Sequence, residues 1–383
     1  MGKQKQEAKK RYFDYTLLTI VIFLMCFGLI MLYSASSYAA QTENHNSMYY
    51  LIRQGLFCVV GFVGMLLVAR IDYHLFAKWS AAAYIIAFVA MALVLTPLGK
   101  EVNHARRWLR MPLGFTIQPS EFMKIAVIIF IPMLICKAGK AFKSTKEVMK
   151  VFLVGATAMG GVWFLTDNLS TAIIVMGIVC IVIFVAHRKT APFLLIATGG
   201  MAIVAIAVKL LDMAMDTSKS FRLRRILVWL HPEEHLQEGG YQVMQGLYAI
   251  GSGGFFGKGL GNSAQKIMIP EAQNDMILAV ICEELGVFGV LVLLTMFGIL
   301  LHRLKYIANN APDRYGALIV TGVFAHIALQ VVLNVAVVLN VIPTTGITLP
   351  FISYGGTSLI FLLTEIGIAL SVSNRIEFDE TEE

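Results

Sequence analysis

Apolar segments of about twenty residues recur along the whole chain, and this pattern constrains the fold more than any other feature. A helix of that length crosses the hydrocarbon core of a bilayer, which is roughly 30 Å thick. Hydrophobic residues make up 57% of the 383 residues and charged residues 14%, whereas soluble domains carry about a quarter charged residues. The first segment is too long for a signal peptide and has no small-residue cleavage site. The sequence therefore predicts an all-α polytopic membrane protein.

We identify ten candidate transmembrane segments. They cover residues 14–34, 50–70, 79–98, 118–137, 147–165, 169–187, 191–213, 276–302, 315–341 and 350–372. This arrangement leaves one large loop, between the seventh and eighth helices, and no room for a separate soluble domain. We expect a single transmembrane domain over residues 1–375 and a disordered acidic cytoplasmic tail over 376–383.

Lysine and arginine residues in the loops predict the orientation of the chain, because short cytoplasmic loops carry an excess of both. The segment before the first helix is rich in them, and every predicted loop on the same side contains them. On the opposite side, residues 36–49, 166–168 and 342–349 contain none. Both termini are therefore expected in the cytoplasm. The net charge of +7 follows from this topology, and no nucleic-acid-binding motif accompanies it.

Two outer loops, residues 99–118 and 216–275, carry positive charge where the topology rule expects little. This departure predicts that both loops bind something anionic. Arg106 and Arg107 offer forked donors that suit phosphate oxygens, and Trp108 offers an amphipathic ring at headgroup level. The alternative is that these arginines only anchor lipid headgroups.

The fourth segment has a predicted helix start at residues 118–121. Ser120 can cap the helix, with Pro119 ahead of it. Glu121 and Lys124 then stand three residues apart on one helical face. We expect these two side chains to form an ion pair near the membrane surface.

The long outer loop has two notable parts. Residues 242–250 are predicted to form a short amphipathic helix, and residues 251–261 form a glycine-rich turn that contains Lys258. Backbone amides in such a turn can lie against an anion. A glycine-rich turn alone is as often a flexible linker. Because Arg222 and Arg225 lie in the same loop as this turn, we favour the interpretation that the turn binds an anion.

Asp275 is the candidate chemical group, because it lies where the long loop meets the eighth segment. A carboxylate at the boundary of water and lipid can have a raised pKa and still be reached by substrate, which suits a general base. The alternative is a helix N-cap. Glu283 and Glu284 lie about two turns further into the membrane. They are either a packing pair neutralised by a buried Lys or Arg, which we favour, or catalytic groups.

The stretch at residues 342–358, IPTTGITLPFISYGGTS, interrupts the chain just where the tenth segment should begin. Irregular backbone at membrane depth is tolerated only where protein buries it or where it lines a cavity. We therefore expect this stretch to line the site opposite Asp275 and to bring Ser353 and Gly355 to it.

This stretch, followed by a short helix and Ser-Asn-Arg at 373–375, resembles the C-terminal signature of the SEDS family (shape, elongation, division and sporulation proteins), to which FtsW, RodA and SpoVE belong. The signature resembles the division and sporulation members more than the elongation member. Further matching motifs are Tyr-Ser-Ala-Ser at 33–36, Arg-Arg-Trp at 106–108, Gln-Pro-Ser-Glu at 118–121, Leu-Ser-Thr at 169–171, Tyr-Gln at 241–242, Ala-Ile-Gly-Ser-Gly-Gly at 249–254, Gly-Leu-Gly at 259–261 and Glu-Glu-Leu-Gly at 283–286. The resemblance covers essentially the whole chain. Where the family often has Asp before the Leu-Ser-Thr step, this chain has Asn168.

The resemblance implies a peptidoglycan glycosyltransferase that polymerises lipid II at the outer face of the bacterial cytoplasmic membrane, during cell division or sporulation. It implies that Asp275 is the general base. It also implies a class B penicillin-binding protein as partner, alongside other membrane proteins of the divisome or elongasome. The residues expected to bind substrate are Arg106, Arg107, Trp108, Glu121, Lys124, Arg222, Arg225, Lys258, Ser353 and Gly355. A divalent cation (Mg²⁺ or Mn²⁺) could screen the pyrophosphate, but no ligand cluster in the sequence identifies a metal site.

Two other functions stay open. A lipid II flippase would also suit ten spans with intramembrane polar groups at His326, Gln330, Asn334 and Glu365. A flippase needs polar access from both faces, whereas here the unexpected charge and the broken backbone concentrate on the outer half. The third possibility is a non-catalytic scaffold for the penicillin-binding protein, and in that case Asp275 would be dispensable.

Overall fold

The computed structural model describes residues 10–102, 105–111, 116–187 and 221–378. Eight helices in this part of the chain are long and apolar enough to cross a membrane. They are α1 (Tyr15–Asn44), α2 (Tyr49–Arg70), α3 (Tyr73–Leu93), α4 (Pro119–Ala138), α5 (Thr145–Thr166), α6 (Leu169–Ala186), α10 (Ile277–Asn309) and α11 (Arg314–Val338). The shorter apolar helix α12 (Thr357–Ser373) joins them. The predicted all-α polytopic fold is confirmed, and the predicted segment at 191–213 lies outside the described residues.

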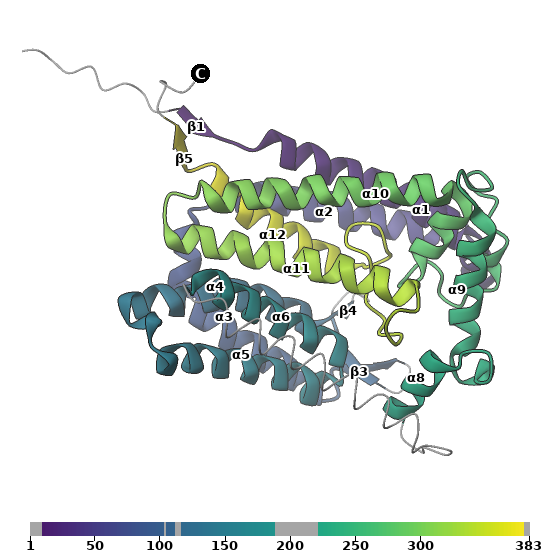
Figure 1. Cartoon of the computed structure of the whole chain (residues 1–383), viewed down its shortest axis with the longest axis horizontal. Coiled ribbons are helices and arrows are strands. Elements are labelled where there is room, and N and C mark those ends of the chain that lie inside the picture. The colour runs from purple at the N-terminus through teal and green to yellow at the C-terminus, as the bar shows by residue number, and fades with distance from the viewer. Residues whose placement is uncertain (1–9, 103–104, 112–115, 188–220, 379–383) are drawn as a thin grey trace, which may run out of the picture.

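Smaller helices and strands lie at the ends of this helical bundle. Strands β2 (Gly99–Val102), β3 (Ala105–Arg110) and β4 (Thr116–Ile117) form an antiparallel sheet in the order β2-β3-β4. The long loop contains α8 (Phe221–Leu230) and α9 (Gly240–Gly253), so the helix predicted over 242–250 is present. Short 3₁₀ turns occur at Gly139–Lys143 (η2), Leu236–Glu238 (η3) and Gln265–Ile267 (η4). The basic β2-β3-β4 sheet, α8 and α9 all lie at one end of the bundle (Figure 1).

The two ends of the described chain meet at the opposite end of the bundle (Figure 1). Strand β1 (Lys10–Tyr12) pairs antiparallel with β5 (Ile376–Phe378). Beside them, the Asp14 carboxylate accepts from Leu17 N–H and caps α1, and it pairs with Arg303 at 2.8 Å. The strand β5 extends the ordered chain beyond the boundary predicted at residue 375, and residues 379–383 lie outside the described part.

The break between α11 and α12 is buried inside the bundle. Residues 339–356 form no helix, and Leu349, Phe351 and Ile352 are buried. Helix α1 approaches this segment closely, because a Cβ on Gly28 would lie only 2.4 Å from the carbonyl oxygen of Phe351. The expectation of irregular backbone enclosed by protein is therefore confirmed.

The start of α4 differs from the prediction. Its N-cap is Gln118 and Pro119 occupies the first helical position, which the fixed φ of proline favours. The N-cap thus lies two residues before Ser120, and the buried Ser120 hydroxyl has no hydrogen-bond partner in the described structure. The assignment of Ser120 as the cap is wrong.

Helix α10 is interrupted at Gly286, which has a φ of 71°. The glycine-rich turn fills the interruption. Lys258 and Gly259 donate their backbone N–H groups to the carbonyls of Glu283 and Glu284, both at 2.9 Å, and Val287 N–H donates to Gly254 at 3.1 Å. These amides therefore replace the helical bonds that the break removes.

Candidate functional site

Asp275 lies in the turn immediately before α10 and is partly buried. The N-cap of α10 is Met276 and no side chain caps that helix, so the N-cap interpretation of Asp275 is wrong. Gln242 of α9 donates to Asp275 Oδ1 at 3.3 Å. Burial raises the pKa of Asp275 to about 6, and the Glu271 carboxylate contributes, while Arg225 and Gln242 act in the opposite direction. This carboxylate is poised to accept a proton near neutral pH.

The backbone around Asp275 is fixed by a fully buried amide. Asn334 Nδ2, on α11, donates to the carbonyl oxygen of Asp275 at 2.9 Å and to that of Ile347 at 2.7 Å. Close by, Tyr354 N–H donates to the carbonyl of Gln273 at 2.9 Å. The segment at 342–356 therefore lies against the turn that bears Asp275, as the sequence predicted.

One guanidinium group, that of Arg225, interacts with Asp275, and a second, that of Arg107, interacts with Arg225. Arg225 Nη1 donates to the carbonyl of Thr344 at 3.5 Å, and Arg107 Nη2 donates to the carbonyl of Asp167 at 2.8 Å. Burial lowers the pKa of both arginines. The charge of Arg225 lowers the pKa of Arg107 further, whereas the charges of Asp275 and Asp167 raise the pKa of Arg225. Arg107 Nε–H is also buried without an acceptor. Desolvated cations with an unmet donor suit an anionic ligand.

The remaining predicted residues of the β2-β3-β4 sheet and α8 occupy different places. Arg106 is exposed and pairs with Glu101 at 3.3 Å. Trp108 lines a cavity of about 140 Å³ together with Arg53, Lys100 and other residues. Arg222 lies in the first turn of α8, and its side chain is outside the described part of the structure.

Lys258 is paired inside the protein. Its ammonium contacts Glu283 Oε1 at 2.6 Å, and Lys266 contacts Glu284 at 3.3 Å. Both glutamates are fully buried, and Ser34 Oγ also donates to Glu284, at 2.6 Å. The favoured interpretation of the two glutamates, a packing pair neutralised by lysines, is the one the structure shows. In the glycine-rich turn, the amides of Lys258 and Gly259 donate to α10, so these two amides are engaged within the protein.

Glu121 and Lys124 form the expected ion pair, with a distance of 2.9 Å. Ser353 bonds within the loop that carries it, and Gly355 joins that loop to α2. Ser353 Oγ accepts from Leu349 N–H at 2.8 Å, and Gly355 N–H donates to Gln54 Oε1 at 3.4 Å. These two residues therefore shape the loop beside Asp275.

Within the described residues, no group of three or more His, Cys, Asp or Glu side chains is placed to hold a metal ion. The divalent cation stays an expectation drawn from the resemblance. The structure identifies no protein ligand set for it.

Sequence reasoning did not assign Gln242, Asn334 and Asp167 to the site. Gln242 starts the predicted amphipathic helix and Asn334 is an amide within an apolar segment, so both had a detectable signal. Asp167 contributes a backbone carbonyl from a residue with a φ of 46°. No side-chain pattern reports such a contact.

Comparison with known proteins places this geometry in a family. Residues 15–377 match the model of the FtsW, RodA and SpoVE family, described as cell cycle proteins. A relative from Trichlorobacter lovleyi, named "Probable peptidoglycan glycosyltransferase FtsW", is 38% identical over 94% of this chain and 93% of its own length. Stage V sporulation protein E of Bacillus subtilis is 37% identical over 95% of this chain and 98% of its own length.

Solved structures of similar proteins have the same fold. One chain, from work on the structural coordination of polymerization and crosslinking by a peptidoglycan synthase complex, superposes with a TM-score of 0.77 at 27% identity, covering 96% of this chain and 99% of that one. The rod shape determining protein RodA of Thermus thermophilus superposes with a TM-score of 0.67 at 25% identity, covering 96% and 98%. With the family match spanning nearly all of its residues, the chain belongs to the SEDS family of FtsW, RodA and SpoVE.

Proposed function

We propose that this chain is a peptidoglycan glycosyltransferase that joins lipid II into glycan strands during cell division or sporulation. The name of the Trichlorobacter lovleyi relative supports the enzymatic class, and that of the Bacillus subtilis relative supports a role in sporulation. The observation that carries the mechanism is Asp275, a partly buried carboxylate whose pKa is raised to about 6. It interacts with the desolvated Arg225, which in turn interacts with the desolvated Arg107.

Asp275 acts as the general base. It takes the proton from the 4-hydroxyl of the acceptor sugar as that oxygen attacks C1 of the donor muramic acid. The bond from C1 to the pyrophosphate oxygen breaks, and the pyrophosphate-lipid leaves. One displacement inverts the anomeric centre. A pKa of about 6 leaves most of the carboxylate ionised at neutral pH while keeping it basic enough to bind the proton.

Arg107 and Arg225 bind the leaving pyrophosphate. Negative charge grows on it in the transition state, and fixed cations in a desolvated site stabilise that charge most strongly. The unmet Arg107 Nε–H supplies a donor that a phosphate oxygen would satisfy. We assign Arg106 and Arg222 to the outer rim of the same end. Lys258 is already engaged by Glu283, so we assign it to holding the break in α10.

The membrane placement follows from charge. The loops that carry Asp275, Arg107 and Arg225 lie at the bundle end opposite the paired termini (Figure 1). With the basic N-terminal segment in the cytoplasm, this end faces outward, and the substrate is reached at the outer face of the cytoplasmic membrane. The structural similarity to a chain of a peptidoglycan synthase complex supports a class B penicillin-binding protein as partner. Other divisome or elongasome membrane proteins are further candidate partners.

The test is polymerisation of lipid II by purified protein, with and without its transpeptidase partner. Wild type, Asp275→Asn and Glu271→Gln are compared. Glu271 lies in the same turn and is exposed. Its carboxylate contributes to the raised pKa of Asp275, so its variant removes a neighbouring negative charge while keeping the base itself. We expect strands from wild type and Glu271→Gln and none from a folded, partner-binding Asp275→Asn protein.

Three outcomes would contradict the proposal in whole or in part. Transport of lipid II across vesicles with no polymer from any sample would indicate a flippase. Absence of both polymer and transport, with complex formation and cell growth intact in Asp275→Asn, would indicate a scaffold. Polymer from Asp275→Asn at the wild-type rate would retain the enzyme and reject this base.

A further inference from the structure

A row of buried ionisable groups crosses the bundle from α4 to α12. Lys124 Nζ lies 2.9 Å from Glu121 Oε2 and 2.9 Å from His326 Nε2, and His326 Nδ1 lies 2.6 Å from Glu365 Oε2. Lys124, His326 and Glu365 are only 2%, 1% and 0% exposed. The polymerisation mechanism above does not use His326 or Glu365.

The distances allow one arrangement of protons while Lys124 is charged. An ammonium only donates, so His326 Nε2 must accept from Lys124. The imidazole is then neutral and carries its proton on Nδ1, from which it donates to Glu365 Oε2. Each bond in the row thus has a defined direction, and the carboxylate of Glu365 fixes the tautomer of His326.

The negative charges in the row outnumber the positive ones. Two carboxylates and one ammonium, with a neutral imidazole, leave one net negative charge in the bundle interior. The second oxygen of Glu365, Oε1, is buried and has no hydrogen-bond partner. In a low-dielectric interior, charges and hydrogen bonds along such a row interact more strongly than they would in water. Glu365 therefore acts on Lys124 without touching it.

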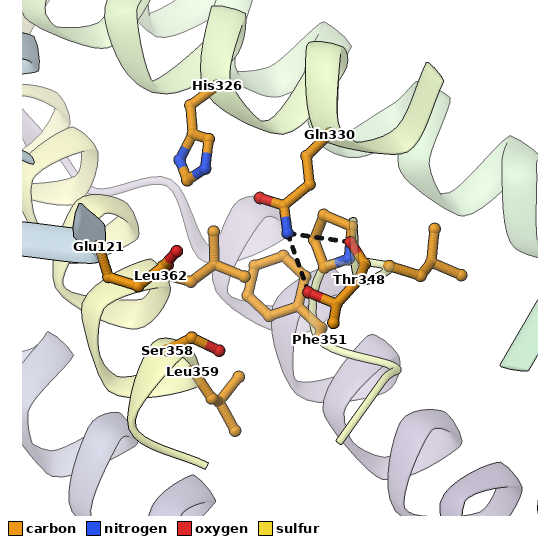
Figure 2. Close-up of a pocket in the computed structure, with 10 residues that line it drawn as sticks. Glu121, His326, Gln330, Thr348, Phe351, Ser358, Leu359 and Leu362 are labelled. Atoms are coloured by element: carbon orange, nitrogen blue, oxygen red, sulfur yellow. Dashed lines mark hydrogen bonds between the residues drawn. The ribbon is translucent and has the colours of Figure 1, made fainter. Parts of the chain in front are cut away.

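The row is also joined to the turn that bears Asp275. His326, Gln330 and Asn334 are spaced four residues apart on α11 and so share one helical face. Figure 2 shows Glu121 and His326 at a cavity of about 20 Å³, with Gln330 bonded to Thr348 at its edge. Asn334 then binds the carbonyl of Asp275. One face of α11 thus holds both the lysine and the base.

We propose that Glu365 is a positioning residue that acts through His326 to fix Lys124 against Glu121, which lines this cavity. The proposal deepens the glycosyltransferase function and rests on it for one consequence: the Lys124–Glu121 pair is held in place beside the face of α11 that also fixes the Asp275 turn. Glu365 and His326 contribute no group to the reacting atoms.

The first experiment tests the proton arrangement without any substrate. Nitrogen NMR of ¹⁵N-histidine-labelled protein, with the His326 signals assigned by their loss in His326→Gln, reports the tautomer. We expect neutral His326 with the proton on Nδ1 in wild type, and a loss of that preference in Glu365→Gln. An imidazolium, or a proton on Nε2, in wild type would overturn the proposal.

The second experiment measures kcat/KM for lipid II polymerisation. Glu365→Gln removes the charge, and His326→Leu removes the link. We expect each to lower kcat/KM on the order of tenfold, as coupled members of a hydrogen-bond network do. The double variant should fall no further than His326→Leu, because Glu365 acts only through His326. Additive losses would overturn the proposal.

A conservative variant and a control complete the design. The amide of His326→Gln can accept from Lys124 and donate to Glu365, so it should restore kcat/KM to within about threefold of wild type. Thr364→Val, next to Glu365, removes a hydroxyl that bonds only the Ile360 carbonyl within α12 and should leave the rate unchanged. A His326→Gln protein as slow as His326→Leu would contradict the link. If wild type forms no polymer, the glycosyltransferase proposal fails while the NMR result still decides the proton arrangement.

Discussion

Replacing Asp275 with Asn should change activity and stability in opposite directions. The substitution keeps the size of the side chain and a group that Gln242 can contact, but it removes the proton acceptor and the negative charge. A general base contributes about 10²- to 10⁴-fold to the rate of proton transfer reactions. We therefore expect kcat of Asp275→Asn to fall by about that factor.

The stability change follows from the pKa of Asp275, which burial raises from 3.8 to about 6. The folded protein binds this proton more tightly than the unfolded chain does, so the ionised carboxylate is destabilising above pH 6. That cost is relieved as the pH falls from 6 towards 4. One pH unit is worth about 1.36 kcal/mol, so the cost at neutral pH is at most about 3 kcal/mol. Asp275→Asn should unfold at a higher temperature than wild type at pH 7, and this advantage should disappear near pH 4.

The assay combines initial rates of lipid II consumption between pH 5 and 8 with thermal unfolding in detergent at the same pH values. The wild-type kcat/KM should fall about tenfold for each pH unit below 6, the pKa of the free base. The reasoning is refuted if Asp275→Asn keeps more than a tenth of wild-type kcat, or if the wild-type pH profile is flat across this range.

Three further perturbations test the framework around the site. Lys258→Met leaves the buried Glu283 carboxylate without its cation and should destabilise the protein by about 3 kcal/mol, an effect that adding Glu283→Gln should largely reverse in thermal unfolding. Gly286→Ala places a Cβ 2.3 Å from the carbonyl oxygen of Phe255, at a residue with a φ of 71°. We therefore expect the free energy of unfolding to fall by more than about 2 kcal/mol, measured as a lowered Tm; an unchanged Tm would contradict the tight fit. Asn334→Ala removes the bonds that join the Asp275 carbonyl and the Ile347 carbonyl to α11. It should lower kcat by about 10²-fold with little change in KM, because a small misplacement of a catalytic group is costly; steady-state kinetics that show only a higher KM would argue against this role.

The fold was predictable from the sequence where the membrane environment restricts the possible structures. Hydrocarbon forces every backbone polar group to be satisfied within a segment, so length and apolar composition are enough to locate helices such as α2 and α10. The same rule exposed the segment at 342–358, because a run of prolines and glycines at membrane depth must be enclosed by protein. Asp275 was detectable for a similar reason: an acid next to an apolar run is costly unless it has a role.

Pairings across the bundle were not predictable. Lys258 lies in a glycine-rich loop whose composition suits an anion cradle, yet its side chain and amide bind α10. The break at Gly286 causes this, because it exposes carbonyls and amides that only a neighbouring segment can satisfy. Sequence position does not reveal which backbone groups a kink will free.

By itself, the sequence determined the number and placement of most spanning helices, the charged outer loops and the identity of the candidate base. These are local properties, set by the length, polarity and order of residues along the chain. The tertiary structure alone decided which buried polar groups meet: Lys124 with His326, His326 with Glu365, and Asn334 with the Asp275 turn. Lys124 and His326 lie 202 residues apart in the chain, and a helix buried on most sides gives no periodic signal for which neighbour its polar groups face. Such groups come within hydrogen-bond distance only when their helices pack at a particular rotation about the helix axis and a particular depth in the membrane. That packing therefore determines which polar groups surround the site.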